Sequence, residues 1–189
     1  MHVLYIHGFN SAGFGNKVDA WREAFGAHTV INPTLPVQPA AAMTLLRYLV
    51  KKLQGPDFCV MGSSLGGFYA LNLAKEFSVK TLLINGAIKD VAYGLDYAKN
   101  PLTNYKTDEL YHWTDADFAA IRAMELTDAD WAAVQPHVFA YLDADDEVLP
   151  SPQIHAFLQA KGIYAKMFPG GDHRFQHMAE AILDFKARP

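Results

Sequence analysis

The chain has 189 residues, of which 51% are hydrophobic and 19% are charged, and its formal net charge is −4 at pH 7. This length fits one domain with a substantial core, and the small negative charge argues against nucleic acid as the main partner. No apolar run approaches the roughly 18 residues that a transmembrane helix needs, so no membrane span is expected.

The first residues and the single cysteine bear on the cellular compartment. Residues 1–6 read as a strand rather than a secretory signal, because they lack a basic segment and a cleavage site. Cys59 cannot form an internal disulfide, and it lies in an apolar run that is typical of a buried structural thiol. We therefore expect a cytoplasmic protein that acts on small molecules. The sequence does not predict the oligomeric state.

Apolar strand-like runs alternate with helical patterns from one end of the chain to the other. This alternation is typical of an α/β fold with a mostly parallel sheet, here of about six strands, and helices on both faces. We expect residues 1–189 to form a single domain. The predicted strands cover residues 2–7, 29–31, 57–62, 80–85, 137–142 and 163–168.

Residues 86–136 interrupt the alternation. They contain two near copies of one pattern, each beginning with Thr-Asp-Ala-Asp at Thr114 and at Thr127. Both threonines are predicted helix N-caps, because the acids that follow suit the positive end of a helix dipole. An insertion of this length between two strands fits a small cap, or lid, over a site, and it also fits a plain crossover.

The main chemical motif is G-x-S-x-G, formed by Gly62, Ser64 and Gly66. An apolar strand ends at Gly62 and a helical pattern begins just after Ser64, which is the strand–turn–helix setting of a nucleophilic serine. Such a turn places Ser64 at a helix N-terminus, where the N–H of Leu65 points toward a substrate oxyanion. The alternative interpretation is a glycine-rich helix start with an ordinary capping serine.

A nucleophilic serine needs a base and an orienting acid. His173 is the candidate base, because it follows the last predicted strand and a glycine-rich turn and therefore lies at the carboxyl edge of the sheet. The strand at 137–142 ends in an acidic run, in which Asp146 is the predicted acid and Asp145 is the alternative. The chain order serine, acid, histidine is that of α/β-hydrolases.

The loop after the first strand, residues 7–11, reads His-Gly-Phe-Asn-Ser. Enzymes of this type take a second oxyanion donor from such a loop, and the N–H of Phe9 is predicted here, with that of Asn10 as the alternative. His177 follows His173 by four residues, but no third metal ligand is apparent, so no metal is predicted. No organic cofactor is expected either.

Together these segments resemble the YqiA-like bacterial esterases, a small α/β-hydrolase family. The resemblance implies an α/β-hydrolase fold and esterase or acyl thioesterase activity on a small-molecule substrate, with Ser64, Asp146 and His173 as the triad. Asp145 stands where the family is expected to carry a small residue, and the insertion matches poorly, so substrate preference is not carried over. The matching segments are residues 7–11, 62–67 and 146–149, together with Asn85, Asn100, Pro101, Thr103, Gly170, Gly171, His173 and Phe175.

Three alternative functions fit parts of the pattern. The same triad serves the hydrolysis of other bonds, such as amide or C–C bonds, and the same scaffold also supports non-catalytic binding proteins. A phosphate- or nucleotide-binding domain would use the turn at 62–67, but it leaves Asp146 and His173 without a role.

Overall fold

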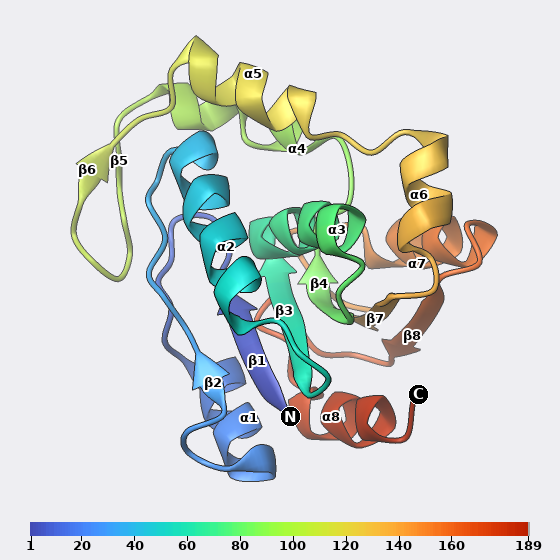
Figure 1. Ribbon diagram of the computed structural model, residues 1–189. Helices are drawn as coiled ribbons and strands as arrows, with labels where there is room; N and C mark the ends of the chain where they lie inside the picture. Colours follow the sequence, from blue (N-terminus) through green and yellow to red (C-terminus); the bar gives the residue numbers. More distant parts are fainter. Residues whose placement is uncertain (189) are drawn as a thin grey trace.

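The computed structural model describes residues 1–188 and contains a six-stranded sheet in the order β2-β1-β3-β4-β7-β8 (Figure 1). Every neighbouring pair in this sheet is parallel. Each strand coincides with one of the apolar runs, so the predicted six-stranded parallel sheet is confirmed. The strands are β1 (His2–Ile6), β2 (Val30–Ile31), β3 (Phe58–Ser64), β4 (Thr81–Gly86), β7 (Val138–Asp143) and β8 (Tyr164–Phe168).

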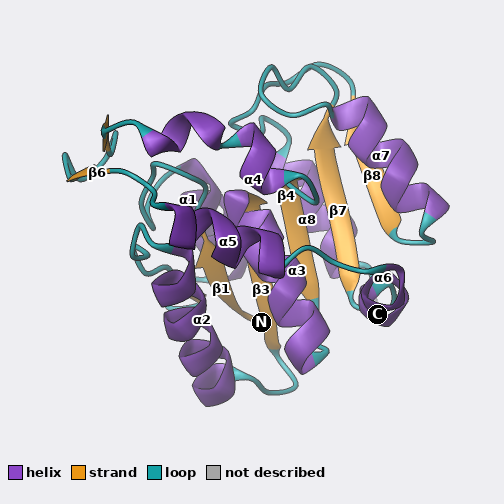
Figure 2. Ribbon diagram, turned by 90° about the horizontal axis from the view of Figure 1, so that it is seen from above, coloured by secondary structure: helices purple, strands orange, loops and turns teal. Residues whose placement is uncertain are grey.

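Helices cover both faces of the sheet (Figure 2). On β1, Val3 and Tyr5 pack in the core beneath α1 and α8, whereas Leu4 and Ile6 pack in the core beneath α2, α3 and α7. Because both of their faces are buried, the central strands β1, β3, β4 and β7 are mostly apolar runs rather than alternating ones. None of the helices within residues 1–188 is long and apolar enough to cross a bilayer. The covering helices are α1 (Asn16–Phe25), α2 (Pro39–Leu53), α3 (Leu65–Phe77), α7 (Ser151–Ala160) and α8 (Met178–Lys186).

The insertion at 86–136 crosses above α2 and α3, and its last helix packs beside α3 (Figure 1). It includes a short antiparallel pair of strands that the sequence did not predict, in which Leu102 pairs with Tyr111. Its elements are α4 (Val91–Gly94), the 3₁₀ helix η1 (Asp96–Lys99), β5 (Leu102–Thr103), β6 (Leu110–Tyr111), α5 (Asp115–Ala123) and α6 (Asp128–Val134).

The two repeated motifs of the insertion begin its two longest helices. Thr127 caps α6: its hydroxyl accepts the Asp130 N–H at 3.3 Å, and the Asp130 carboxylate accepts the Thr127 N–H at 2.9 Å. At α5 the Asp117 carboxylate accepts the Thr114 N–H, also at 2.9 Å. Reciprocal bonds of this kind satisfy main-chain donors that a helix start leaves free, so both N-cap predictions are confirmed.

Candidate active site

Ser64 lies at the junction of β3 and α3 in a backbone conformation that residues other than glycine rarely adopt. Its φ is 53° and its ψ is −127°. The glycines of the motif are required by close backbone approach: a Cβ at Gly62 would overlap the Gly66 carbonyl, and a Cβ at Gly66 would overlap the Ile6 carbonyl. The sharp turn therefore depends on the G-x-S-x-G spacing and holds the serine hydroxyl at the helix N-terminus.

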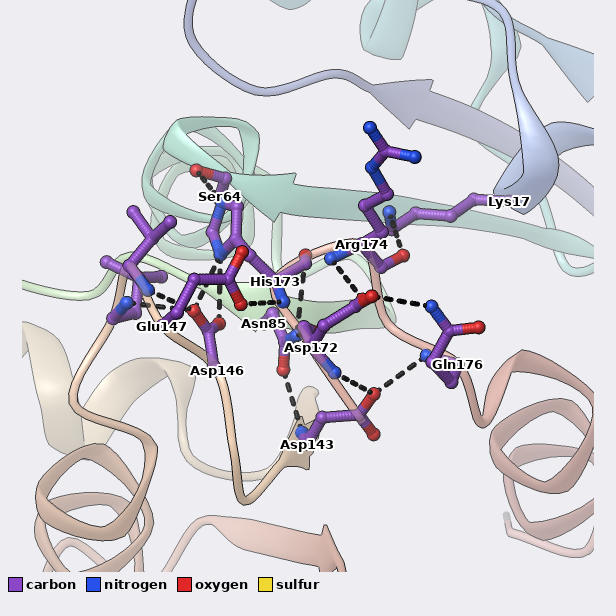
Figure 3. Close-up of polar contacts among 12 residues, drawn as sticks. Lys17, Ser64, Asn85, Asp143, Asp146, Glu147, Asp172, His173, Arg174 and Gln176 are labelled. Atoms are coloured by element: carbon purple, nitrogen blue, oxygen red, sulfur yellow. Dashed lines mark hydrogen bonds and ion pairs between the residues drawn. The ribbon is translucent and has the colours of Figure 1, made fainter. Parts of the chain in front are cut away.

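The imidazole of His173 lies between Ser64 and Asp146 (Figure 3). Its Nε2 is 3.1 Å from the Ser64 hydroxyl oxygen, and its Nδ1 is 2.9 Å from each oxygen of the Asp146 carboxylate. These three residues are separated by 82 and 27 positions in sequence (64 to 146, 146 to 173), yet the carboxyl ends of β3, β7 and β8 bring them together. With a proton on Nδ1, the lone pair of Nε2 faces the serine hydroxyl.

The surroundings of Asp146 keep its carboxylate ionised. The side chain is fully buried, and its Oδ1 accepts the main-chain N–H groups of Val148 and Leu149, each at 2.9 Å. Burial raises the pKa of Asp146, but the hydrogen bonds from His173, Leu149 and Val148 outweigh burial, so the pKa is lowered overall. A charged carboxylate in this position stabilises a protonated His173.

Asp145, the alternative acid, lies apart from His173. Its side chain is exposed, and its main-chain N–H donates to the Gly170 carbonyl at 3.2 Å. Of the two adjacent carboxylates that the sequence left open, the structure therefore brings only Asp146 to the imidazole.

The loop after β1 runs directly past Ser64. A Cβ at Gly8 would lie 2.9 Å from the Ser64 Cβ, so only glycine allows this approach. On the other side of the serine, Leu65 is the first residue of α3, where a helix leaves its N–H groups without intrahelical acceptors. Within residues 1–188 the Phe9 N–H has no hydrogen-bond acceptor. Both predicted oxyanion donors, Phe9 and Leu65, thus belong to segments that adjoin the hydroxyl.

His7 orients the peptide that carries the Phe9 N–H. Its Nε2 accepts the Leu35 N–H at 2.9 Å, so the proton is on Nδ1, which donates to the Gly8 carbonyl at 2.8 Å. In a trans peptide the carbonyl and the N–H point in opposite directions, so the Phe9 N–H points away from His7. Burial lowers the pKa of His7, which favours the neutral ring that this arrangement needs.

The insertion contacts the same loop. The Phe9 ring makes edge-to-face contacts with Trp113, Tyr97 and Tyr111, at centroid distances of 5.2, 5.9 and 6.1 Å. The Tyr111 hydroxyl donates to the Asn10 side chain at 3.1 Å. A pocket between the insertion and the loop has a cavity volume of only about 30 Å³, room for one or two water molecules.

Four further side chains contact the segment that carries His173, and the sequence interpretation assigned no role to them: Lys17, Asn85, Asp143 and Glu147 (Figure 3). A second acid–histidine pair accompanies the first, because Asp143 lies 2.7 Å from Nδ1 of His177. One sequence signal could have indicated this pair: Asp143 precedes Asp146 by three residues, and His177 follows His173 by four. Within residues 1–188 no group of three or more His, Cys, Asp or Glu side chains could hold a metal ion.

A parallel sheet whose third strand ends in a strained serine, with the histidine and the acid at neighbouring strand ends, defines the α/β-hydrolase fold class. The chain belongs to the uncharacterised protein family UPF0227, whose family model matches residues 2–187. That family contains the YqiA-like proteins, so the resemblance found in the sequence motifs is confirmed.

Solved structures with this fold match nearly the whole chain. A hydrolase structure from Agrobacterium vitis S4 has a TM-score of 0.71 at 15% identity, covering 98% of this chain and 87% of that one. The protein Est1E from Butyrivibrio proteoclasticus, solved with ferulic acid, has a TM-score of 0.68 at 16% identity, covering 98% and 89%. An esterase domain from Rhodothermus marinus has a TM-score of 0.67 at 16% identity, covering 96% and 82%. These similarities establish the predicted α/β-hydrolase fold.

Proposed function

We propose that this protein is a serine hydrolase that cleaves carboxylic esters or acyl thioesters through an acyl-enzyme on Ser64. The observation that carries the proposal is the position of the His173 imidazole, within hydrogen-bond distance of both the Ser64 hydroxyl and the Asp146 carboxylate. A serine hydroxyl is a weak nucleophile until a neighbouring base takes its proton, and this arrangement supplies that base.

The proposed reaction has two acyl-transfer steps. His173 Nε2 takes the hydroxyl proton as Ser64 Oγ attacks the substrate carbonyl, and the N–H groups of Leu65 and Phe9 donate to the resulting oxyanion. His173 then gives the proton to the leaving alcohol or thiol, which departs as the acyl-enzyme forms. In the second step His173 Nε2 takes a proton from the water that attacks the acyl group, and Leu65 and Phe9 again donate to the oxyanion. As the bond from the acyl carbon to Ser64 Oγ breaks, His173 gives this proton to Oγ, so the acid is released and both side chains return to their starting states.

Two further observations support this proposal over a non-catalytic scaffold. Ser64 has a positive φ of 53°, and a non-glycine residue in such an unfavourable backbone conformation commonly marks a functional site. A domain named as an esterase, the one from Rhodothermus marinus, also shares the fold.

The test is ester hydrolysis by the purified protein and two variants, with p-nitrophenyl acetate and a short acyl thioester as substrates. Ser64→Ala and His173→Ala should each lower kcat on the order of 10⁶-fold, because the residues of a triad act as a unit. Both variants should unfold at the wild-type temperature, apart from a small shift. A folded wild-type protein that hydrolyses neither substrate, or a Ser64→Ala variant as active as the wild type, would refute the proposal.

A further inference from the structure

The segment that carries His173 is held by side chains from distant parts of the chain. Residues 172–176 form an irregular turn between β8 and α8, where main-chain polar groups lack the partners that a helix or strand provides. Lys17 in α1 donates to the Arg174 carbonyl at 2.8 Å, and the Glu147 carboxylate accepts the His173 N–H at 2.9 Å (Figure 3).

Asp143, the last residue of β7, makes the largest number of these contacts. Its side chain is fully buried, and its Oδ2 accepts the N–H groups of Gln176 at 2.7 Å and Asp172 at 3.3 Å. Its Oδ1 lies 2.7 Å from Nδ1 of His177. A Cβ at Gly171 would overlap the same carboxylate, so the turn closes tightly over it. The hydrogen bonds of the Asp143 carboxylate are thus all with residues 172–177, the turn that carries His173 and the first residue after it.

Asn85 links β7, the strand that ends at Asp143, to the turn that carries His173. It lies near the end of β4 with a φ of 41° and is 1% exposed. Its Nδ2 donates to the Asp172 carbonyl at 2.8 Å, and its Oδ1 accepts the Asp143 N–H at 2.8 Å. Both polar groups of Asp172's main chain are therefore bound by side chains from the sheet, directly before His173.

His177 completes the arrangement at the start of α8. Its ring stacks on Phe168 at a centroid distance of 4.9 Å and an interplanar angle of 8°. The two acid–histidine pairs, Asp146 with His173 and Asp143 with His177, thus bind the two ends of one turn. Only His173 contacts Ser64, so the second pair is available for holding the turn.

From these contacts we infer that Asp143 and Asn85 are positioning residues, which hold the His173 imidazole in line with the Ser64 hydroxyl. The inference rests on the proposed serine hydrolase function. Proton transfer from serine requires the nitrogen and oxygen to stay within hydrogen-bond reach, and a displacement of about 1 Å costs about 10²-fold in rate. A turn without regular secondary structure does not hold that position by itself, whereas contacts to the ends of β4 and β7 transmit the rigidity of the sheet.

The test compares Asp143→Ala, Asp143→Asn and Asn85→Asp with Asp145→Asn as a matched control. The control removes a carboxylate from the same loop after β7, but the Asp145 side chain is exposed.

Asp143→Ala should lower kcat for p-nitrophenyl acetate about 10²-fold, with KM within about twofold. Asp143→Asn should lose less, about tenfold, because an amide oxygen still accepts the Gln176 and Asp172 N–H groups. Asn85→Asp places a carboxylate oxygen against the Asp172 carbonyl and should resemble Asp143→Ala. Asp145→Asn should stay within about twofold of the wild type.

A second readout does not depend on catalysis. The proton on His173 Nδ1, bonded to Asp146, should give a sharp downfield proton NMR signal in the wild type and in Asp145→Asn. This signal should broaden or vanish through faster solvent exchange in Asp143→Ala and Asn85→Asp. If Asp143→Ala does not fold, Asp143→Asn and Asn85→Asp decide the question. If the wild type hydrolyses no ester, the proposed function fails and the NMR signal alone tests the positioning.

Three results would overturn the inference. The first is a wild-type kcat and a wild-type His173 signal in folded Asp143→Ala or Asn85→Asp. The second is a lowered kcat with an unchanged His173 signal, since the loss would then arise elsewhere in the site. The third is an equal loss in the Asp145→Asn control, which would assign the effect to net charge rather than to contacts with the turn.

Discussion

Asp145 and Asp146 are neighbours in the acidic run that follows β7, but their surroundings in the folded chain differ. Asp146 is buried and bonded to His173 and to two main-chain N–H groups, while the Asp145 side chain is exposed. The sequence predicted Asp146 as the acid and kept Asp145 as the alternative, because which of the two carboxylates turns inward depends on how the chain leaves β7.

The two carboxylates should therefore respond very differently to removal of their charge. In Asp146→Asn the amide can donate to Nδ1 of His173, which would place the ring proton on Nε2, facing the Ser64 hydroxyl. This wrong tautomer should lower kcat about 10³- to 10⁴-fold, while Asp145→Asn should change it less than about twofold. Steady-state rates on a short ester check this, and similar losses in the two variants would contradict the assignment of the acid.

Lys17 is a buried cation beside the same turn, only 8% exposed. Burial lowers its pKa to about 8 from 10.5, although the nearby carboxylates of Asp172, Asp143 and Asp146 oppose this shift. Between these two pH values the unfolded chain binds a proton at Lys17 that the folded chain does not. The contribution of Lys17 to the free energy of unfolding must then rise with pH in this window, by up to about 1.4 kcal/mol per pH unit.

Urea unfolding of the wild type and Lys17→Met at pH 7, 8, 9 and 10 tests this prediction. The difference in free energy of unfolding, wild type minus variant, should be smallest at pH 7 and should grow in favour of the wild type from pH 8 upward. Lys51→Met, at an exposed position of α2, serves as the matched control. A difference that stays flat or falls as the pH rises would contradict the account of Lys17.

At the scale of elements, the sequence predicted the parts with a strong local pattern. Most strands of the sheet are continuous apolar runs, and the two helices that follow Thr114 and Thr127 carry their own N-cap signals. The hairpin of β5 and β6 was missed because each strand has only two residues, too short for any periodicity. It forms where Tyr111 and Asn104 bond the loop after β1, which is a tertiary contact without a local signal.

This hairpin should affect the loop after β1 that it contacts, which carries the proposed Phe9 donor. Tyr111→Phe removes the hydroxyl that donates to the Asn10 side chain and keeps the ring against Phe9. Loss of one buried hydrogen bond is worth about 1 kcal/mol, so kcat for a short ester should fall about fivefold with little change in KM. Tyr105→Phe, in the same hairpin but 83% exposed, is the matched control and should retain the wild-type rate. An unchanged rate in Tyr111→Phe, or an equal loss in Tyr105→Phe, would show that the Tyr111–Asn10 hydrogen bond does not set the position of the loop.

At the scale of the whole molecule, the parallel sheet accounts for most of what could be predicted about the site. Parallel strands all end at one edge, so residues at the ends of β3, β7 and β8 must meet there whatever their separation in sequence. The contacts of Asn85, Asp143 and Lys17 could not be predicted, because they join side chains to main-chain atoms of a distant turn. Such contacts depend on the final path of the turn, which no sequence pattern of these residues encodes.

The central claim is that His173 activates the Ser64 hydroxyl for attack on an acyl group. Labelling with a fluorophosphonate, followed by peptide mapping by mass spectrometry, tests it most directly, because the reagent forms a stable adduct with activated serines. One adduct per chain is predicted, on the peptide that contains Ser64, with none in Ser64→Ala and far slower labelling in His173→Ala. A folded wild-type protein that stays unlabelled, or equal labelling of Ser64→Ala, would contradict the claim.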